Sequence, residues 1–234
     1  MPMGLLGPRT FPDPVVNPNA TEFEVNNWII SEFVLRKLVP VVGIHPFPLN
    51  ELMLMAGAVC RFRPGLILEW GTHTGVSARV FRETIVAFGI PSAVHSVDLP
   101  DDVHHGEHPR KQRGKYVRGL KEVTLHQGDG VTRSLELCDQ LAPAGTVLFY
   151  VDGDHSYASV SRELTAILDA RPDAIVLLHD TFYQSADSGY NIGPHRAVQD
   201  VLAGRSRNYK LVRTGTGLPG MTLLYPDGAH PSAR

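Results

Sequence analysis

The chain has little of several features that mark whole classes of protein. Its 234 residues include only two cysteines, Cys60 and Cys138, which form no motif and are expected to sit reduced in a core. The charges nearly balance at a net −2, so there is no general attraction to nucleic acid or anionic lipid. No run approaches the ~20 apolar residues that cross a bilayer. The expectation is a protein with no nucleic-acid partner and no membrane contact.

The first residues, MPMGLLGPRTFPDP, contain neither a basic segment nor a long apolar segment. No signal peptide is therefore expected, and the predicted location is cytoplasmic. Hydrophobic residues make up 43% of the chain and charged residues 20%, which is enough apolar material for an ordinary globular core.

Three regions are predicted along the chain. Residues 1–20 carry five prolines and little periodicity, so they should form an arm on the surface or on a neighbouring copy. Residues 21–62 should form a helical cap, and residues 63–234 the main domain. The arm and the cap, with its Trp28, favour a homo-oligomer or a wall of the binding pocket.

Within the cap, one helix is predicted over 21–38, stopping before Pro40. A second helix is predicted to begin near Pro48, a residue suited to a first helical turn. Its apolar face recurs at helical spacing in Leu52, Met55, Ala56 and Val59.

From residue 65 onward, short apolar runs alternate with segments of helical periodicity. Runs without polar alternation are typical of parallel strands that are covered on both faces. The repetition predicts an α/β fold with a doubly wound, Rossmann-like sheet. The five predicted parallel strands are 65–70, 93–98, 122–127, 146–151 and 174–179.

The end of the chain has a different pattern. A helix over 194–203 precedes two strand-like runs, 208–213 and 221–226, joined by the short link GTGLPG. A link this short requires antiparallel pairing. The predicted sheet is therefore five parallel strands closed at one edge by a hairpin.

An acidic residue stands at or just after the end of every predicted parallel strand. The carboxyl ends of such strands meet at one edge of the sheet, where ligands bind. A single aspartate there is usually the cap of the next helix. Five in register predict a site, and they are Glu69, Asp98, Asp129, Asp152 and Asp180.

The first strand–helix turn reads ILEWGTHTGVS, and its Gly71 and Gly75 allow a tight passage. It contains neither the G-x-G-x-x-G of dinucleotide sites nor the G-K-[ST] of P-loops. Glu69 would repel a phosphate and would suit a cationic cofactor such as S-adenosylmethionine. Asp98 is placed to accept both hydroxyls of a ribose, and Asp129, in QGDG, should lie near an adenine.

The motif E-x-G-x-x-x-G-x-S, with Asp98, QGDG, VDGDHSY and LHDT, resembles class I S-adenosylmethionine-dependent methyltransferases. Over about residues 45–225 the chain is most similar to the macrocin O-methyltransferase and cephalosporin-hydroxylase-like group of antibiotic biosynthesis. It resembles catechol O-methyltransferase more distantly. The resemblance implies a seven-stranded sheet whose last strand is antiparallel. It also implies cofactor binding by Glu69, Gly71, His73, Gly75, Ser77, Asp98, Asp129 and Gly130.

In metal-dependent members of that group, the acid ending the fourth strand binds Mg²⁺ together with a pair ending the fifth. The matching residues here are Asp152, His179 and Asp180. A bound cation would lower the pKa of an acceptor hydroxyl. His179 departs from the usual acidic residue and is a better ligand for softer divalent ions, or else a buried histidine.

Removal of the hydroxyl proton requires a base. His155 has an ordinary pKa near ~6.5, which suits this step at neutral pH. Asp154 is the competing candidate for the base, and it is otherwise a metal ligand, an orienter of His155 or a helix cap.

Two loops are predicted to enclose the site. Residues 101–121 hold His104, His105 and His108 beside six basic residues. A metal cluster or an RNA contact is less favoured there than a lid that continues into a solvated helix. Residues 181–193 are the second predicted wall, and their aromatic residues could stack on an acceptor: Phe182, Tyr183 and Tyr190.

These observations predict an O-methyltransferase that acts on a hydroxyl of a polar small molecule, such as a sugar on a natural product. One alternative is a non-catalytic S-adenosylmethionine-binding partner in a biosynthetic complex, which would have little need of the VDGDHSY stretch. Another is a metal-dependent hydrolase, which would leave Glu69, Gly71 and Asp98 unexplained.

Overall fold

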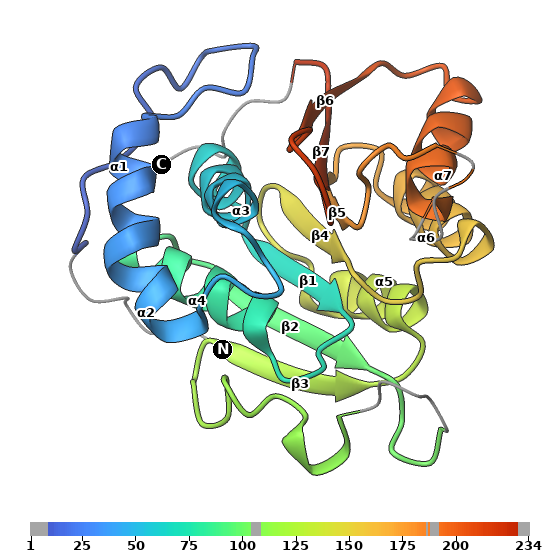
Figure 1. Cartoon of the computed structure of the whole chain (residues 1–234), viewed down its shortest axis with the longest axis horizontal. Helices are drawn as coiled ribbons and strands as arrows, with labels where there is room; N and C mark the ends of the chain where they lie inside the picture. Colours follow the sequence, from blue (N-terminus) through green and yellow to red (C-terminus); the bar gives the residue numbers. More distant parts are fainter. Residues whose placement is uncertain (1–8, 104–108, 186, 188–191, 229–234) are drawn as a thin grey trace.

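The computed structural model describes residues 9–103, 109–185, 187 and 192–228. Seven strands form one sheet in the order β3-β2-β1-β4-β5-β7-β6 (Figure 1). The strands are β1 (Leu66–Trp70), β2 (Ala93–Asp98), β3 (Val123–Gln127), β4 (Val147–Val151), β5 (Ile175–His179), β6 (Tyr209–Arg213) and β7 (Met221–Pro226).

The pairing confirms the predicted fold class. Strands β1 to β5 pair in parallel, and β7 runs antiparallel to both β5 and β6. Every residue of β1, β4 and β5 is buried, as expected of continuous apolar runs covered on both faces.

The register of β1 brings three loops together. Trp70, its last residue, lies opposite Val97 of β2 on one side and Val151 of β4 on the other. The chain therefore leaves the sheet side by side at Gly71, Asp98 and Asp152. The strand order reverses at β1, which is where open α/β sheets bind ligands.

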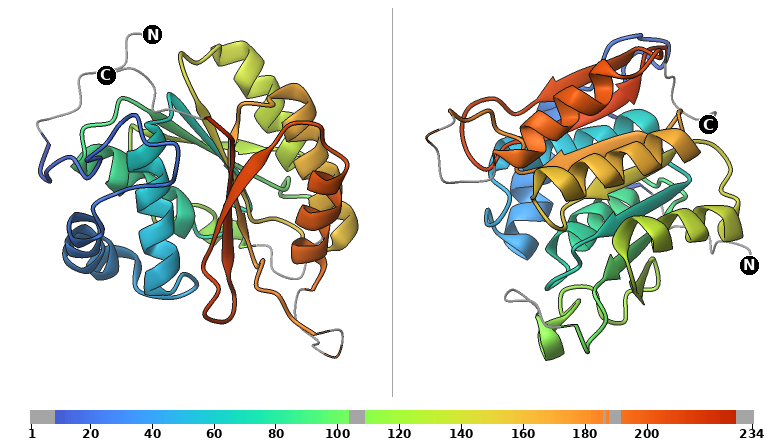
Figure 2. Two further views of the ribbon diagram at one scale, coloured as in Figure 1. Left: turned by 90° about the horizontal axis from the view of Figure 1, so that it is seen from above. Right: turned by 90° about the vertical axis from the view of Figure 1, so that its right-hand side faces the viewer.

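Helices cover both faces of the sheet in two layers (Figure 2). One layer holds α3 (Leu49–Phe62) and α4 (Val76–Ala87), with the N-terminal helices packed outside them. The other holds α5 (Gly130–Leu141), α6 (Tyr157–Ala170) and α7 (Gly193–Ala203). None of the helices within the described parts of the chain is long and apolar enough to cross a membrane.

The first predicted helix differs at both ends. It begins at α1 (Asn27–Phe33), where the Asn26 side chain accepts hydrogen bonds from the N–H groups of residues 28 and 29. It then passes through a π-helical segment, Val34–Leu38, into α2 (Val39–Val42). The prediction that it stops before Pro40 is wrong, because a proline fits the first turn of a new helical segment after a wide turn.

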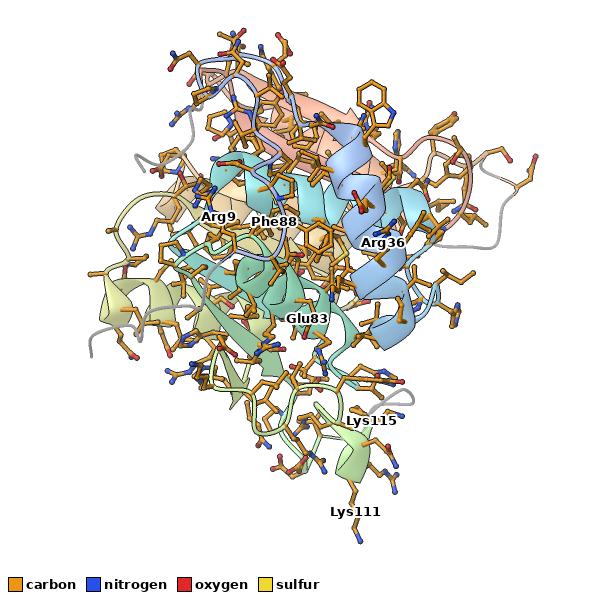
Figure 3. The ribbon with its side chains drawn as sticks, turned by 90° about the vertical axis from the view of Figure 1, so that its left-hand side faces the viewer. Arg9, Arg36, Glu83, Phe88, Lys111 and Lys115 are labelled. Atoms are coloured by element: carbon orange, nitrogen blue, oxygen red, sulfur yellow. The ribbon has the colours of Figure 1, made fainter. Side chains whose placement is uncertain are left out.

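The arm segment from Arg9 onward crosses the end of α4 near Phe88 (Figure 3). The N–H groups of Thr10 and Phe11 both reach the carbonyl of Ala87, at 2.9 and 3.3 Å. The Phe11 ring packs edge-on against Phe33, with centroids 5.4 Å apart. The described part of the arm is therefore tied to the same core as the first helices.

The segment after β2 also differs from expectation. Residues 109–121 form turns and one short 3-10 helix, Arg110–Gln112, so the predicted solvated helix is wrong there. Gly114 and Gly119 take positive φ angles of 63° and 78°, which interrupt a helix. Lys111 and Lys115 extend from this segment (Figure 3). His104, His105, His108 and Tyr190 lie outside the described residues.

Candidate active site

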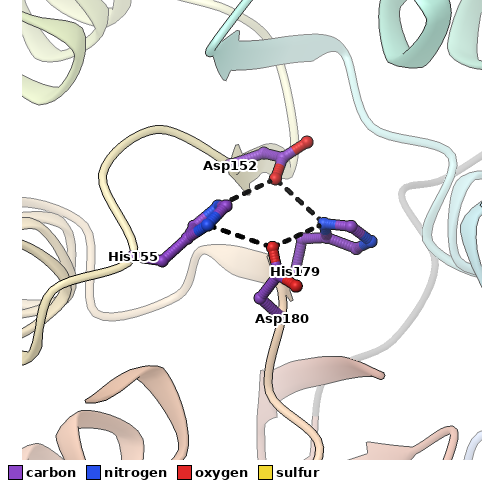
Figure 4. Close-up of side chains that lie close together, drawn as sticks. All are labelled: Asp152, His155, His179 and Asp180. Carbon is purple, nitrogen blue, oxygen red and sulfur yellow. Dashed lines mark hydrogen bonds and ion pairs between the residues drawn. The ribbon is translucent and has the colours of Figure 1, made fainter. Parts of the chain in front are cut away.

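Four side chains converge where β4 and β5 end, and we call them the His–Asp cluster: Asp152, His155, His179 and Asp180 (Figure 4). Asp152 directly follows β4, while His179 ends β5 and Asp180 follows it. Each of the four offers one ligand atom, and these atoms all lie within 4.8 Å of one another. The predicted metal ligands are thus brought together, and His155 joins them.

Each carboxylate of the His–Asp cluster bridges both imidazoles. Oδ1 of Asp152 lies 3.3 Å from Nε2 of His155 and 3.0 Å from Nδ1 of His179. Oδ2 of Asp180 lies 3.1 Å from Nδ1 of His155 and 3.2 Å from the same Nδ1 of His179. The two rings and two carboxylates form a closed circuit of contacts (Figure 4).

The pKa values in the His–Asp cluster are set by burial and by the closeness of its carboxylates and imidazoles. Burial opposes ionisation of Asp152, yet the neighbouring histidines hold the pKa of its carboxyl below the ordinary value. Burial likewise opposes charge on His179, but the surrounding carboxylates raise its pKa well above the usual range. The pKa of His155 is raised in the same way by Asp152 and Asp180, against the effect of burial.

Two further residues support the His–Asp cluster and were missed by sequence reasoning. Glu51, in the first turn of α3, is fully buried, and its Oε2 lies 3.1 Å from Nε2 of His179. The Tyr150 hydroxyl donates to Oδ2 of Asp152 at 3.0 Å. A signal for Glu51 was available, since it stands four residues before Met55, on the apolar face of its helix.

Asp154 points elsewhere. Its carboxylate accepts hydrogen bonds from the backbone N–H of Ser156 at 3.0 Å and from the Ser156 hydroxyl at 2.9 Å. The Ser156 hydroxyl in turn accepts from the N–H of Ser159 as the N-cap of α6. Of the two predicted bases, His155 lies in the cluster, while Asp154 stabilises the start of a helix.

Glu69 is fully buried beside the first turn. Its Oε1 accepts from the Ser96 hydroxyl at 2.5 Å, while its Oε2 has no hydrogen-bond partner among the described residues. Burial raises the pKa of Glu69 to about 8, outweighing the hydrogen bonds from Ser96 and Ser77. A buried carboxylate oxygen without a partner is costly, and a cation bound there would remove the cost.

The two glycines of the first turn are required by close contacts. Gly71 has φ of 86°, and a Cβ on it would lie 1.9 Å from the carbonyl oxygen of Asp152. Gly75 has φ of 85° and abuts Val117 and Gly114 of the segment after β2. The first turn therefore packs directly against the backbone of the His–Asp cluster.

Asp98 is held by the surrounding backbone and by an arginine. Its Oδ2 accepts from the N–H of His73 at 3.1 Å and from Nε of Arg113 at 3.2 Å. Its Oδ1 accepts from the N–H of Leu99 at 2.9 Å. His73 itself has a positive φ of 44°. Arg113 was not predicted here, because nothing in the sequence shows that its loop folds back onto β2.

The structure gives Asp129 a capping role. Its carboxylate accepts from the N–H of Thr132 at 3.1 Å as the N-cap of α5, and it pairs with Arg162 at 2.9 Å. The Arg162 guanidinium lowers the pKa of Asp129 to about 2. Gly130 follows, and a Cβ on it would lie 2.4 Å from Cγ of Trp70. QGDG thus begins α5 and packs it against the end of β1.

Residues 68–181 match the family model described as a methyltransferase domain. This chain carries a methyltransferase domain. The matched stretch runs from β1 to just beyond Asp180, so it contains Glu69, Asp98 and the whole His–Asp cluster. The prediction of a methyltransferase is confirmed. A search of curated proteins finds no match.

Solved structures share the fold of this methyltransferase domain and its flanking helices. A protein of Klebsiella pneumoniae described as a candidate O-methyltransferase is 20% identical, with a TM-score of 0.55, over 85% of this chain and 90% of its own. The O-methyltransferase TomG of Streptomyces achromogenes, solved with S-adenosylmethionine, is 20% identical with a TM-score of 0.51, over 86% and 88%. An O-methyltransferase of Bacillus cereus, solved with the demethylated cofactor, is 15% identical with a TM-score of 0.52, over 84% and 90%.

Proposed function

We propose that the protein is an S-adenosylmethionine-dependent O-methyltransferase, assisted by a divalent metal, that methylates a hydroxyl of a polar small molecule. The observation that carries the proposal is the contact between the two halves of the site. The first turn, with Glu69 and Gly71, lies against the Asp152 backbone that begins the His–Asp cluster. A methyl donor and an acceptor hydroxyl held in these halves would be neighbours.

The cofactor half fits a cationic nucleoside. Glu69 offers a buried carboxylate oxygen without a partner among the described residues, and Gly71 and Gly75 add no side chain at the two ends of the turn. The first turn of α4, from Val76, has no side-chain cap within the described parts of the chain, so its amides can face a ligand. Asp98 ends β2, where a ribose would lie, although it already accepts three hydrogen bonds. We assign cofactor contacts to Glu69, Gly71, His73, Gly75, Ser77, Asp98, Asp129 and Gly130.

The metal half fits a divalent ion that accepts nitrogen as well as oxygen. Asp152, His179 and Asp180 would hold it, and their oxygen and nitrogen atoms already face one another. Two carboxylates suit Mg²⁺ or Mn²⁺, and the imidazole favours the softer ions. Such an ion would supply a lowered pKa at the acceptor hydroxyl, while the cofactor would supply the methyl group.

The residues of the chain then position the acceptor and move one proton. His155 presents Nδ1 to Asp180, and its Nε2 has the longer contact, 3.3 Å, to Asp152. With Nδ1–H donated to Asp180, Nε2 of a neutral His155 would take the proton from the acceptor hydroxyl. The hydroxyl oxygen would bond to the methyl carbon of the cofactor as the carbon–sulfur bond breaks, and the demethylated cofactor would be the leaving group. Holding the reactants in line supplies much of the rate in transfers of this kind.

The walls of the acceptor site are loops, which supports a small molecule as the substrate. Tyr183 is largely exposed and packs against His195, with ring centroids 4.9 Å apart. Phe182 is tied through its N–H to the carbonyl of Pro219. A sugar on a natural product fits such an aromatic rim, and the Streptomyces achromogenes neighbour is described as taking part in tomaymycin synthesis. The macrocin-type group of antibiotic enzymes is the one that we propose.

Calorimetric titration of EDTA-treated protein with S-adenosylmethionine, then with Mg²⁺ or Mn²⁺ added, tests the assignment. Micromolar binding is expected, and it should be lost in Glu69→Ala. An Asp152→Ala variant should still bind the cofactor and fail to methylate any hydroxylated acceptor that the wild type accepts. Absence of cofactor binding under every condition would remove the proposed function, and full activity of Asp152→Ala would remove the metal.

A further inference from the structure

Glu51 joins three parts of the molecule that the sequence keeps far apart. It stands in the first turn of α3, and both of its carboxylate oxygens are used. Oε1 accepts from the N–H of Gly220 at 2.8 Å, while Oε2 lies 3.1 Å from Nε2 of His179. Glu51 is fully buried, and among the described residues its only charged-pair partner is His179, an arrangement that is rare for a glutamate without a specific role.

The His179 ring is fixed on its other sides as well. The Phe47 ring stands edge-on to it, with centroids 5.1 Å apart and planes at 77°. Nδ1 faces Oδ1 of Asp152 at 3.0 Å and Oδ2 of Asp180 at 3.2 Å. With Nε2 on Glu51, rotation of the ring would break the contact with Glu51 and turn Nδ1 away from both aspartates.

We propose that Glu51 is a positioning residue that holds Nε2–H of His179 and thereby presents Nδ1 to a divalent ion shared with Asp152 and Asp180. This inference rests on the metal half of the proposed function. Carboxylates commonly hold the outer nitrogen of a metal-binding histidine, which fixes the tautomer and strengthens the ligand. Here the carboxylate comes from an N-terminal helix, outside the stretch that matches the methyltransferase domain.

The two contacts of Glu51 explain why a carboxylate is needed rather than an amide. Gly220 and His179 both present a donor, so each oxygen must accept. A glutamine has one accepting oxygen, and its NH₂ group would face one of the two donors. Glu51→Gln therefore preserves the shape of the side chain and removes one of the two hydrogen bonds.

The experiment compares Glu51→Gln with Glu163→Gln, a second buried glutamate that lies on α6 away from the His–Asp cluster. Binding of Mn²⁺ and of S-adenosylmethionine is measured separately by calorimetry on the full chain. Glu51→Gln should weaken Mn²⁺ binding by about 10–100-fold. It should leave cofactor binding within a factor of about two, whereas Glu163→Gln should leave Mn²⁺ binding unchanged.

Ring nitrogen spectra supply a readout that general destabilisation would not move. In ¹H–¹⁵N spectra of the histidine rings, assigned with a His179→Gln variant, the wild type should show a proton on Nε2 of His179 both without metal and with a diamagnetic ion, Mg²⁺ or Zn²⁺, because paramagnetic Mn²⁺ would broaden the ring signals. Glu51→Gln should lose or shift that signal. Unchanged Mn²⁺ affinity, an unchanged His179 signal, or a wild-type ring with no proton on Nε2 would overturn the inference. A wild type that binds no metal but keeps the Nε2 proton would overturn the metal role alone. The proposed methyltransferase activity would then still be tested by the binding of S-adenosylmethionine.

Discussion

At the scale of single residues, the site depends on carboxylates whose surroundings give them different properties. Asp152 and Asp180 face imidazoles, and Asp129 faces a guanidinium. Glu69 accepts a hydrogen bond from the Ser96 hydroxyl and is fully buried, and burial raises its pKa to about 8. Residues of one chemical type, at equivalent places in the sequence, are thus prepared for different partners.

The raised pKa of Glu69 predicts a pH dependence of cofactor binding. Below about pH 8 the free carboxyl is mostly protonated and neutral, and it must lose its proton to pair with a cation. Affinity for S-adenosylmethionine should therefore rise with pH, by roughly 25-fold between pH 6.5 and 8.5. Calorimetry at several pH values measures this. Glu69→Gln should bind more weakly and show a flatter profile, and an equal slope in both proteins would assign the effect to another group.

The two candidate bases can be separated by substitution. His155→Gln should lower kcat by about 10²–10⁴-fold, because it removes the group that takes the proton. Asp154→Asn should stay within a few-fold of the wild type, because that carboxylate supports the start of α6 through its hydrogen bonds from Ser156. Steady-state rates with a saturating acceptor measure both. A large loss in Asp154→Asn with normal activity in His155→Gln would exchange the roles.

At the scale of elements, the central strands could be predicted from the sequence, because buried parallel strands are continuous apolar runs with turn residues at their ends. All five predicted parallel strands are confirmed, with ends shifted by one residue at most. The first helix was misjudged at Pro40, where a π-helical segment allows the chain to continue. The segment after β2 was misjudged because its glycines interrupt the helical pattern.

The close packing of the first turn can be tested by measuring stability, without any assay of activity. Gly71→Ala would place a methyl group 1.9 Å from the Asp152 carbonyl oxygen, at a φ of 86° that disfavours side chains. The free energy of unfolding should fall by about 2 kcal/mol or more. Urea denaturation measures it. Gly215→Ala is the matched control, since a Cβ there meets nothing within 4 Å. Equal stability of the two variants would contradict the close packing of the turn.

At the scale of the whole molecule, the N-terminal helices share one core with the sheet. Phe33 packs against Phe88, with ring centroids 5.0 Å apart, and Phe62 packs against Tyr225 at 5.2 Å. Half of the site was predictable because strand ends lie on one edge of a parallel sheet. Arg113 was not, because its place depends on how a loop folds back over that edge, and the sequence marks Glu51 only as an acid on the apolar face of a cap helix, without showing that it reaches His179.

Association of copies is a prediction that belongs to this scale. Trp28 is 86% exposed on α1, and Leu35, seven residues further along in the π-helical segment that continues α1, is 57% exposed. Paired apolar side chains on an outer helix suit contact with a second copy, since monomers rarely leave such surfaces bare. Light scattering after size-exclusion chromatography should show an oligomer, and Trp28→Ser should shift it toward the monomer. A wild type that runs as a monomer at every concentration would contradict this prediction.

The contact between Gly71 and the Asp152 carbonyl has a consequence for engineering. The loop around Tyr183, which we propose as a wall of the acceptor site, does not take part in that contact, so exchanging it between relatives should change which alcohol is methylated. The first turn cannot be exchanged so freely. A replacement turn taken from a relative must have glycine at position 71. Any other residue there would displace the end of β4 at Asp152.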